Sequence, residues 1–259
     1  MIYDLTMYSG EDDLLEIRLE ELAGVIDKFI IIESEYSHSL IKKPLLFDIK
    51  KLSKFSDRII YVVKDSFHDN AFVNDWAARE NLFAAIPNPK SDDILHFSDL
   101  DEVTNSDQLS YVLDGGLKAP VNFESSYRFF CLDLYGRKSR DAMVMRYDWI
   151  TTNFYKYRDS RNNEDTYRIP DAGWHFSSVG TPESIVRKWK WFAHYNEVGE
   201  QYKNEEWIRS QIKRKAGSWD KDAKDEELRL VGHKYPDLPD YVVKNLDKFR
   251  HLFYEYYSD

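Results

Sequence analysis

The chain has 259 residues, of which 42% are hydrophobic and 15% aromatic, so it can bury one substantial core with an appendage. Its 36 basic and 46 acidic residues give a formal net charge of −10, which disfavours nucleic acid and anionic membranes as partners. The single cysteine, Cys131, excludes an internal disulfide framework and a cysteine-rich zinc site. Because neither a signal-peptide pattern nor a long apolar run occurs, we expect a cytoplasmic protein without a membrane span.

The first hundred residues alternate between strand and helix patterns. Residues 2–8 are typical of a strand, and the leucine spacing that follows predicts an amphipathic helix. The unbroken apolar run from Phe29 to Ile32 predicts a strand buried on both faces of a parallel sheet. A second such strand at 57–63, a helix at 74–86 and a third strand entering "DDILHFSDLDEV" (92–103) complete the series. This order predicts an α/β, Rossmann-like fold with a mostly parallel central sheet, whose ligands bind beyond the carboxyl ends of the strands.

The second half has different patterns. The aromatic segments 120–137 and 143–158 alternate as antiparallel strands do. Residues 182–197, 204–217 and 239–259 are predicted to be helical. We therefore expect a main domain over 1–197 and a helical C-terminal extension over 198–259 packed on it.

Three carboxylates, Asp99, Asp101 and Glu102, follow the strand in "DDILHFSDLDEV". Clustered carboxylates repel one another unless a positive group lies between them. Asp99 and Asp101 form a D-x-D tripeptide, and carboxylate oxygens are ligands that Mg²⁺ or Mn²⁺ prefers. Such an ion can bridge the phosphates of a nucleotide diphosphate and assist its departure. The alternative is a solvated loop with an Asx turn.

The set of segments "YDLTMYSGEDDLLEIRLEEL", "DKFIIIESEYSHSLIKKPLLF", "WAARENL", "DDILHFSDLDEV" and "AGWHFSSVGTPESIVRKWKWFAHYNE" resembles glycosyltransferase family 17. This family contains the β-1,4-mannosyl-glycoprotein β-1,4-N-acetylglucosaminyltransferases. The resemblance extends from residue 2 to about residue 197, with the segments in the same order. It implies a GT-A type domain that binds a nucleotide sugar, a divalent metal, and inversion at the anomeric carbon.

By this resemblance, Asp99 faces the ribose or the metal, Asp101 binds the metal, and His175 of "GWHFSS" completes the metal shell or bonds a phosphate. The donor pocket is assigned by position to Glu11, Glu33 and Lys43. For Glu11 the alternative is stabilisation of the dipole of the first helix, and for His175 it is packing.

Arg79 and Trp174 are two further candidates for donor binding, and each also has a purely structural interpretation. Arg79 could contact a phosphate or ribose of the donor, or pack on the surface. Trp174 could stack on a sugar or fill the core. His194 is a second and poorer metal-ligand candidate.

Inversion requires a general base near the acceptor hydroxyl, usually a carboxylate. The candidates are Glu124, Asp133, Asp148 and Asp171. Asp171 is the first choice because it lies just before the Gly-Trp-His tract, and Glu124 is the second. For Asp171 the alternative is a turn after Pro170.

These observations lead to a metal-dependent, inverting glycosyltransferase with a UDP-linked donor, with GlcNAc as the first candidate sugar. The acceptor is a glycan, a lipid or another small molecule, and the missing membrane segment and lumenal cysteines suggest a microbial or viral enzyme. One alternative is a phage-type enzyme that glycosylates modified DNA bases, supported by the basic tracts "RKWKW" (187–191) and "KRK" (213–215). The other is a non-catalytic sugar- or nucleotide-binding module that uses the aromatic surface at 127–157.

Overall fold

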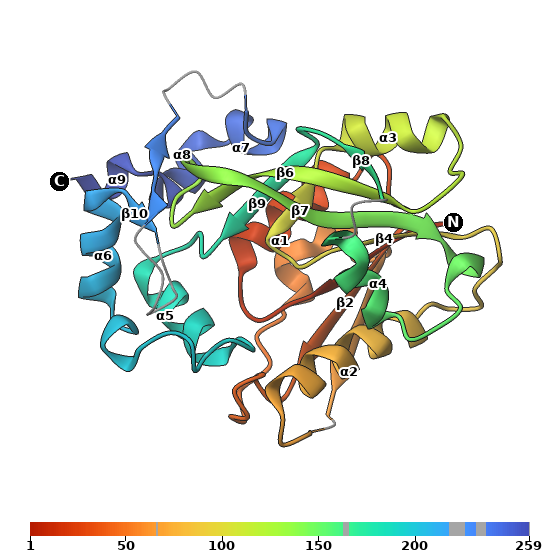
Figure 1. Cartoon of the computed structure of the whole chain (residues 1–259), viewed down its shortest axis with the longest axis horizontal. Coiled ribbons are helices and arrows are strands. Elements are labelled where there is room, and N and C mark those ends of the chain that lie inside the picture. Colours follow the sequence, from red (N-terminus) through yellow and green to blue (C-terminus); the bar gives the residue numbers. More distant parts are fainter. Residues whose placement is uncertain (66, 163–165, 218–225, 232–236, 259) are drawn as a thin grey trace.

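A ten-stranded mixed sheet forms the centre of the molecule in this computed structural model, which describes residues 1–65, 67–162, 166–217, 226–231 and 237–258 (Figure 1). Its main path runs β3–β2–β1–β4–β7–β6–β9–β5. The strands along this path are β3 (Ile59–Lys64), β2 (Lys28–Ser34), β1 (Ile2–Met7), β4 (Ile94–Phe97), β7 (Leu134–Arg146), β6 (Val121–Phe129), β9 (Gly173–Ser177) and β5 (Glu102–Thr104). The short strand β8 (Tyr167–Ile169) pairs with β6 in parallel.

The N-terminal part of the sheet is parallel, as predicted. Strand β1 lies between β2 and β4, with Leu5 opposite Ile30 on one side and Phe97 on the other. In β2 the residues from Phe29 to Ile32 are at most 2% exposed, because both faces of the strand are covered. The order 3-2-1-4 reverses direction between β1 and β4, and ligands of open α/β sheets bind at such a switch point. The predicted α/β fold class is confirmed.

Helices cover both faces of this parallel part. Leu15 and Leu19 of α1 (Asp12–Leu22) pack in one cluster with Phe29 of β2 and with Leu109 of α3 (Ser106–Asp114). The opposite face of β2 packs against Leu82 of α2 (Ala71–Ala84). The division follows from the alternation of side chains along a strand.

Helix α2 begins three residues before its predicted start. The side chain of Asn70 accepts hydrogen bonds from the backbone N–H groups of Phe72 and Val73, at 2.9 and 3.2 Å. Such an N-cap satisfies donors that a helix start otherwise leaves free.

The predicted antiparallel strands are confirmed for β6 and β7, but the prediction was wrong beyond Arg146. There the chain forms a 3-10 helix (Tyr147–Trp149) and then α4 (Tyr155–Asp159). One aromatic residue of this stretch packs inward against another layer: Phe154 is 2% exposed and contacts Phe83 and Phe97. An aromatic-rich pattern therefore did not distinguish a strand from a packed loop.

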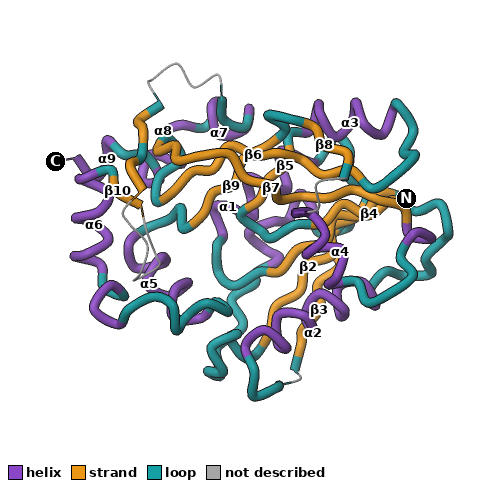
Figure 2. Tube along the Cα trace, in the orientation of Figure 1, coloured by secondary structure: helices purple, strands orange, loops and turns teal. Residues whose placement is uncertain are grey.

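The C-terminal region is mainly helical, as predicted, but its helices are shorter. These are α5 (Pro182–Trp191), α6 (Glu205–Arg214), α7 (Asp240–Lys244), α8 (Leu246–Phe249) and α9 (Glu255–Ser258). Helix α5 ends because Phe192 is extended, and Asn245 has a non-helical backbone between α7 and α8. Short strands β10 (Ala216–Gly217), β11 (Glu226–Glu227) and β12 (Arg229–Leu230) also occur, and β12 pairs with β7. Figure 2 shows α5, α6 and α9 gathered at the end of the sheet away from the N-terminus.

The last helices pack on α1. Val242 and Phe249, both 0% exposed, share a core cluster with Leu14 and Ile17. Glu16 accepts a hydrogen bond from the Tyr241 hydroxyl at 2.5 Å and pairs with Lys248, and Asp13 pairs with His251 at 2.8 Å. The domain boundary near residue 198 stays a prediction, and residues 218–225, 232–236 and 259 of the extension lie outside the described part of the chain.

Candidate functional site

The acidic turn predicted from the sequence connects β4 to β5 at the switch point of the sheet. The backbone N–H of Glu102 donates to the carbonyl of Asp99 at 3.0 Å. The Glu102 carboxylate in turn accepts from the backbone N–H of Asp99 at 2.8 Å. These two bonds fix a tight turn that presents Asp99 and Asp101 near the carboxyl end of β4.

A buried arginine of α1 binds the backbone of this turn. Arg18 of α1 is 0% exposed, and it forms a bidentate pair with Asp4 of β1 at 2.6 and 2.8 Å. Its remaining guanidinium nitrogen donates to the Ser98 hydroxyl and to the carbonyls of Asp99 and Glu102, at 2.8 to 2.9 Å. A planar guanidinium suits several fixed acceptors at once, so Arg18 sets the position of the turn relative to the sheet.

Asp99 lies between two arginines. Its two carboxylate oxygens pair with Arg79 at 2.9 Å and with Arg158 of α4 at 3.0 Å. Arg158 also pairs with Glu102, and Arg79 pairs with Asp75. Burial opposes ionisation of Asp99, but the two guanidinium groups outweigh it and lower the pKa of that carboxyl well below its usual value.

Asp101 faces a different set of cations. The Lys188 ammonium of α5 lies 2.6 Å from Asp101 Oδ2 and 3.8 Å from Glu11 Oε1. His175 of β9 approaches the same oxygen of Asp101 with Nε2 at 4.0 Å. Glu11, placed in the donor pocket from the sequence, therefore lies beside Asp101 through Lys188.

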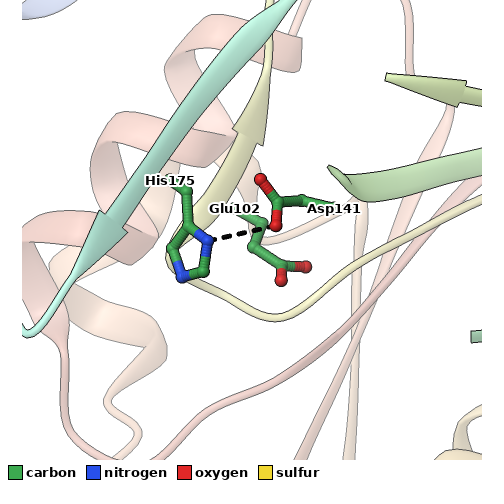
Figure 3. Close-up of side chains that lie close together, drawn as sticks. All are labelled: Glu102, Asp141 and His175. Carbon is green, nitrogen blue, oxygen red and sulfur yellow. Dashed lines mark hydrogen bonds and ion pairs between the residues drawn. The ribbon is translucent and has the colours of Figure 1, made fainter. Parts of the chain in front are cut away.

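His175 is oriented by a carboxylate that the sequence did not single out. Its Nδ1 lies 3.1 Å from Asp141 Oδ1, and the other oxygen of Asp141 accepts from Ser139 at 2.5 Å. Figure 3 shows His175, Asp141 and Glu102 converging from β9, β7 and β5. One ligand atom from each of the three lies within 4.8 Å of the other two.

The electrostatics of this cluster follow from burial and mutual contact. Burial opposes the charge on His175, but Asp141, Asp101 and Glu102 outweigh it and raise the pKa of the imidazole to about 9. Burial also raises the pKa of Glu102, to about 7, although Arg158 lowers it. Burial would raise the pKa of Asp141 as well, but His175 and Ser139 lower it to about 2.

The donor chemistry of these residues fits a divalent cation that replaces the proton kept on His175 by its raised pKa. Asp101 Oδ2 and His175 Nε2 face each other, and the other nitrogen of His175 bonds to the carboxylate of Asp141. Metal-binding histidines are typically oriented by such a second carboxylate. Asp99 is occupied by two arginines, so Asp101 and His175 fit the cation better than Asp99 does.

Residues 1–255 match glycosyltransferase family 17. The chain belongs to this family.

Three relatives of this family 17 chain have the same enzyme name. The beta-1,4-mannosyl-glycoprotein 4-beta-N-acetylglucosaminyltransferase of Rattus norvegicus is 25% identical over 93% of this chain and 52% of that protein. The enzymes of the same name from Mus musculus and Homo sapiens are each 24% identical over 93% of this chain. This chain thus spans about half the length of the relatives it matches. The predicted enzyme class, glycosyltransferase, agrees with the family.

Similar solved structures are distant. The 2-C-methyl-D-erythritol 4-phosphate cytidylyltransferase of Francisella tularensis has a TM-score of 0.40 and 11% identity, over 73% of this chain and 99% of that chain. The inositol-1-phosphate CTP transferase of T. maritima has a TM-score of 0.32 and 10% identity, over 68% and 84% of the two chains.

Glu33 and Lys43, assigned to the donor pocket, are buried and form a 2.9 Å ion pair. Glu33 also accepts from the backbone N–H groups of Leu46 and Phe47 and from the Tyr61 hydroxyl, at 2.8 to 3.0 Å. In this geometry the pair holds the loop after β2 in place. Its assignment to donor binding in the family 17 chain stays a prediction.

Asp171, Glu124 and Trp174 form a separate group. Asp171 and Trp174 line a hollow of about 330 Å³ together with Lys138, which pairs with both Asp171 and Glu124. Adjacent residues of a strand point to opposite faces, so Trp174 lies on the face of β9 away from His175. Trp174 is 6% exposed and donates to the carbonyl of Asp237 at 2.9 Å, as a packed residue does. This placement gives no support to the predicted roles of the three residues, which remain untested.

The other candidate bases also bond elsewhere. Asp133 accepts from the backbone N–H of Tyr254 at 2.9 Å, and Asp148 pairs with Arg146 at the surface. His194, the second ligand candidate, pairs with Glu197 at 2.6 Å.

Another hollow, of about 540 Å³, is lined by residues between Tyr111 and Val121 with Tyr167 and Ile169. Neither hollow includes Asp99 or Asp101.

The basic tract at 187–191 contributes to the acidic site instead of forming a free patch. Lys188 pairs with Asp101, Arg187 donates to the carbonyl of Gly10 at 3.0 Å, and Trp189 is 0% exposed. The DNA-directed alternative therefore loses its main local support. Across the described residues, no helix is long and apolar enough to cross a membrane.

Sequence reasoning missed Asp141, Arg158 and Lys188 as parts of the site. Asp141 directly precedes the apolar run Ala142–Met145, and a charge inside a buried strand is a signal that could have identified it. Lys188 lies in a basic, aromatic tract whose composition does not indicate a carboxylate partner. No local pattern distinguishes Arg158, because its partners come from residues 99 and 102.

Proposed function

We propose that this protein transfers a sugar, with GlcNAc as the first candidate, from a UDP-linked donor to a hydroxyl group of a glycan, with inversion and with the help of Mn²⁺ or Mg²⁺. Family membership supports glycosyl transfer, and the enzyme name of the relatives supports GlcNAc and a mannosyl glycan acceptor. The observation that carries the proposal is the convergence of Asp101, His175 and Asp141 at the switch point of the sheet.

The charges of the site support a donor that arrives together with a metal ion. Each carboxylate of the D-x-D tripeptide already faces a cationic side chain: Asp99 faces Arg79 and Arg158, and Asp101 faces Lys188. A diphosphate entering alone would add about two negative charges, which a divalent ion bound to it neutralises. A diphosphate that enters together with a divalent ion therefore leaves the net charge of the site unchanged.

Each residue has a role in this proposal. Asp101 and His175 hold the ion, and Asp141 keeps the imidazole in the orientation that directs Nε2 toward Asp101. Asp99 orients Arg79 and Arg158, whose guanidinium groups lie where phosphate or ribose oxygens of the donor can be bound. The bound ion supplies Lewis-acid assistance to the leaving diphosphate.

The test is release of UDP from UDP-GlcNAc with Mn²⁺ and a mannosyl oligosaccharide acceptor. We expect Asp101→Asn to lower the rate by about 100-fold or more, because an amide cannot neutralise the cation as a carboxylate does. Excess chelator should abolish the activity of the unmodified protein.

The matched control is Glu206→Gln, which makes the same chemical change at an exposed residue of α6. It should retain full activity. Full activity of Asp101→Asn, or of the unmodified protein in chelator, would refute the role of the metal. If the unmodified protein transfers sugar from none of the nucleotide-linked donors, the proposed transfer reaction is refuted.

A further inference from the structure

Lys188 lies where a divalent ion would be expected to lie. Its ammonium is 2.6 Å from Asp101 Oδ2, the same oxygen that faces His175 Nε2 at 4.0 Å. The Lys188 side chain is 22% exposed and that of Asp101 is 11% exposed, so the contact is shielded from water. A lysine ammonium and a metal ion cannot both occupy the region in front of one carboxylate oxygen without strong repulsion.

The helix that carries Lys188 is fixed in place. The next residue, Trp189, is 0% exposed and donates to the Ser178 hydroxyl at 2.9 Å. On the preceding turn Ile185 is 1% exposed in the same core cluster. The backbone of α5 therefore cannot move far, and any change in the position of the ammonium comes from rotation within the long Lys188 side chain.

An alternative partner for the ammonium is already present. Glu11 Oε1 lies 3.8 Å from Lys188 Nζ, and Arg187 joins α5 to the same loop through the carbonyl of Gly10. If Lys188 leaves Asp101, Glu11 keeps its charge beside the site. The flexible four-carbon stem of lysine permits such a change without movement of the helix.

We propose that Lys188 neutralises Asp101 in the absence of metal, is displaced by the arriving divalent ion, and then binds the diphosphate of the donor. The proposal rests on the proposed function, because it assumes that Asp101 and His175 are the metal site. It makes Lys188 a binding residue with two successive partners. Two consequences follow: Lys188 weakens the binding of metal to the free protein, and it strengthens the binding of a diphosphate.

The first measurement is calorimetric titration of the donor-free protein with MnCl₂. We expect Lys188→Met to bind Mn²⁺ at least about tenfold more tightly than the unmodified protein, because a competing positive charge is removed. Lys188→Arg should retain the weaker affinity. Lys190→Met makes the same change at an exposed position of the same helix and should bind Mn²⁺ as the unmodified protein does.

The second measurement is titration with UDP at a MnCl₂ concentration that saturates both proteins, so that the ion has displaced Lys188 from Asp101. Here Lys188→Met should bind UDP about tenfold more weakly or worse, since the ammonium that contacts the diphosphate is gone. Opposite changes in Mn²⁺ and UDP affinity are the signature of the proposal. A merely structural role of Lys188 would weaken both.

The outcomes separate this inference from the proposed function. Equal or weaker Mn²⁺ binding by Lys188→Met, while the unmodified protein binds Mn²⁺, overturns the role of Lys188 and leaves the metal site intact. Absence of Mn²⁺ binding in both proteins overturns the role of Lys188 together with the metal site, and UDP release in chelator then shows whether transfer proceeds without metal. Each variant is first checked by its melting temperature, and Lys188→Gln replaces Lys188→Met if the latter does not fold.

Discussion

Asp99 and Asp101 are two residues apart, yet their surroundings give them different properties. Asp99 is saturated by two arginine guanidinium groups, whereas Asp101 is held by one lysine ammonium and faces an imidazole. A lysine releases its partner more readily than a bidentate or paired arginine contact does, because its ammonium is strongly hydrated. At the level of residues, Asp101 is therefore the exchangeable carboxylate of the turn and Asp99 the fixed one.

A second residue-level property concerns the buried histidine beneath the turn. His96 is 0% exposed, with Nδ1 2.7 Å from Asp4 and Nε2 2.8 Å from Thr104. Burial lowers the pKa of His96 below its ordinary value of 6.5, although Asp4 acts in the opposite direction and Arg18 adds to the lowering. The imidazole is thus buried in its neutral form.

This lowered pKa predicts a loss of stability in mild acid. As the pH falls below 6.5, the unfolded chain takes up a proton on His96 that the folded chain does not, so the free energy of unfolding decreases. In His96→Gln this contribution is absent. We expect the stability difference between the two proteins to shrink by up to about 1.4 kcal/mol per pH unit between about pH 6.5 and about pH 5, measured by urea unfolding. Parallel stability curves would show that His96 does not stay neutral in the folded protein.

At the level of elements, the site depends on the close pairing of β5 and β9. Glu102 and His175 lie opposite each other across this antiparallel pair, and Gly173 lies opposite Thr104 at its end. A Cβ atom on Gly173 would lie 2.5 Å from the carbonyl oxygen of Val103 and 3.1 Å from Cα of Thr104. Both are backbone atoms, which cannot yield as a flexible side chain would.

Gly173→Ala should therefore separate β5 from β9. We expect a loss of about 1 to 3 kcal/mol in the free energy of unfolding, because overpacking forces the backbone to shift. Gly24→Ala is the matched control, since nothing lies within 4 Å of its added Cβ. Similar stability of the two variants would contradict the close approach of the strands.

At the level of the whole molecule, the C-terminal helices form part of the same core as the α/β sheet. Phe249, with 0% exposure, packs beside Leu14 and Ile17 of α1. We expect Phe249→Ala to lower the free energy of unfolding by about 3 to 5 kcal/mol while the urea transition stays single. Val243→Ala, at a residue that is 37% exposed, should change it far less. Two separate transitions in the unmodified protein would instead show that the extension folds independently.

The sequence predicted the parallel half of the fold well, because its strands are unbroken apolar runs and its helices have clear periodicity. Motif and family resemblance also singled out Asp99, Asp101 and His175, and the structure places Asp101 and His175 4.0 Å apart, while the roles of all three stay predictions. Sequence reasoning failed where tertiary contacts decide. Phe154 packs inward from a loop, and Asn245 interrupts a helical pattern. Lys188 becomes part of the site only through its contact with a carboxylate 87 residues away in the sequence.

Helix α1 contacts both the acidic turn and the C-terminal helices. One of its residues, Arg18, binds the carbonyl groups of the acidic turn, and two others, Asp13 and Glu16, bind the C-terminal helices. A displacement of α1 by one of its bonding partners would therefore be transmitted to the other. We therefore expect some substitutions near residues 241–251 to change the position of the acidic turn through α1.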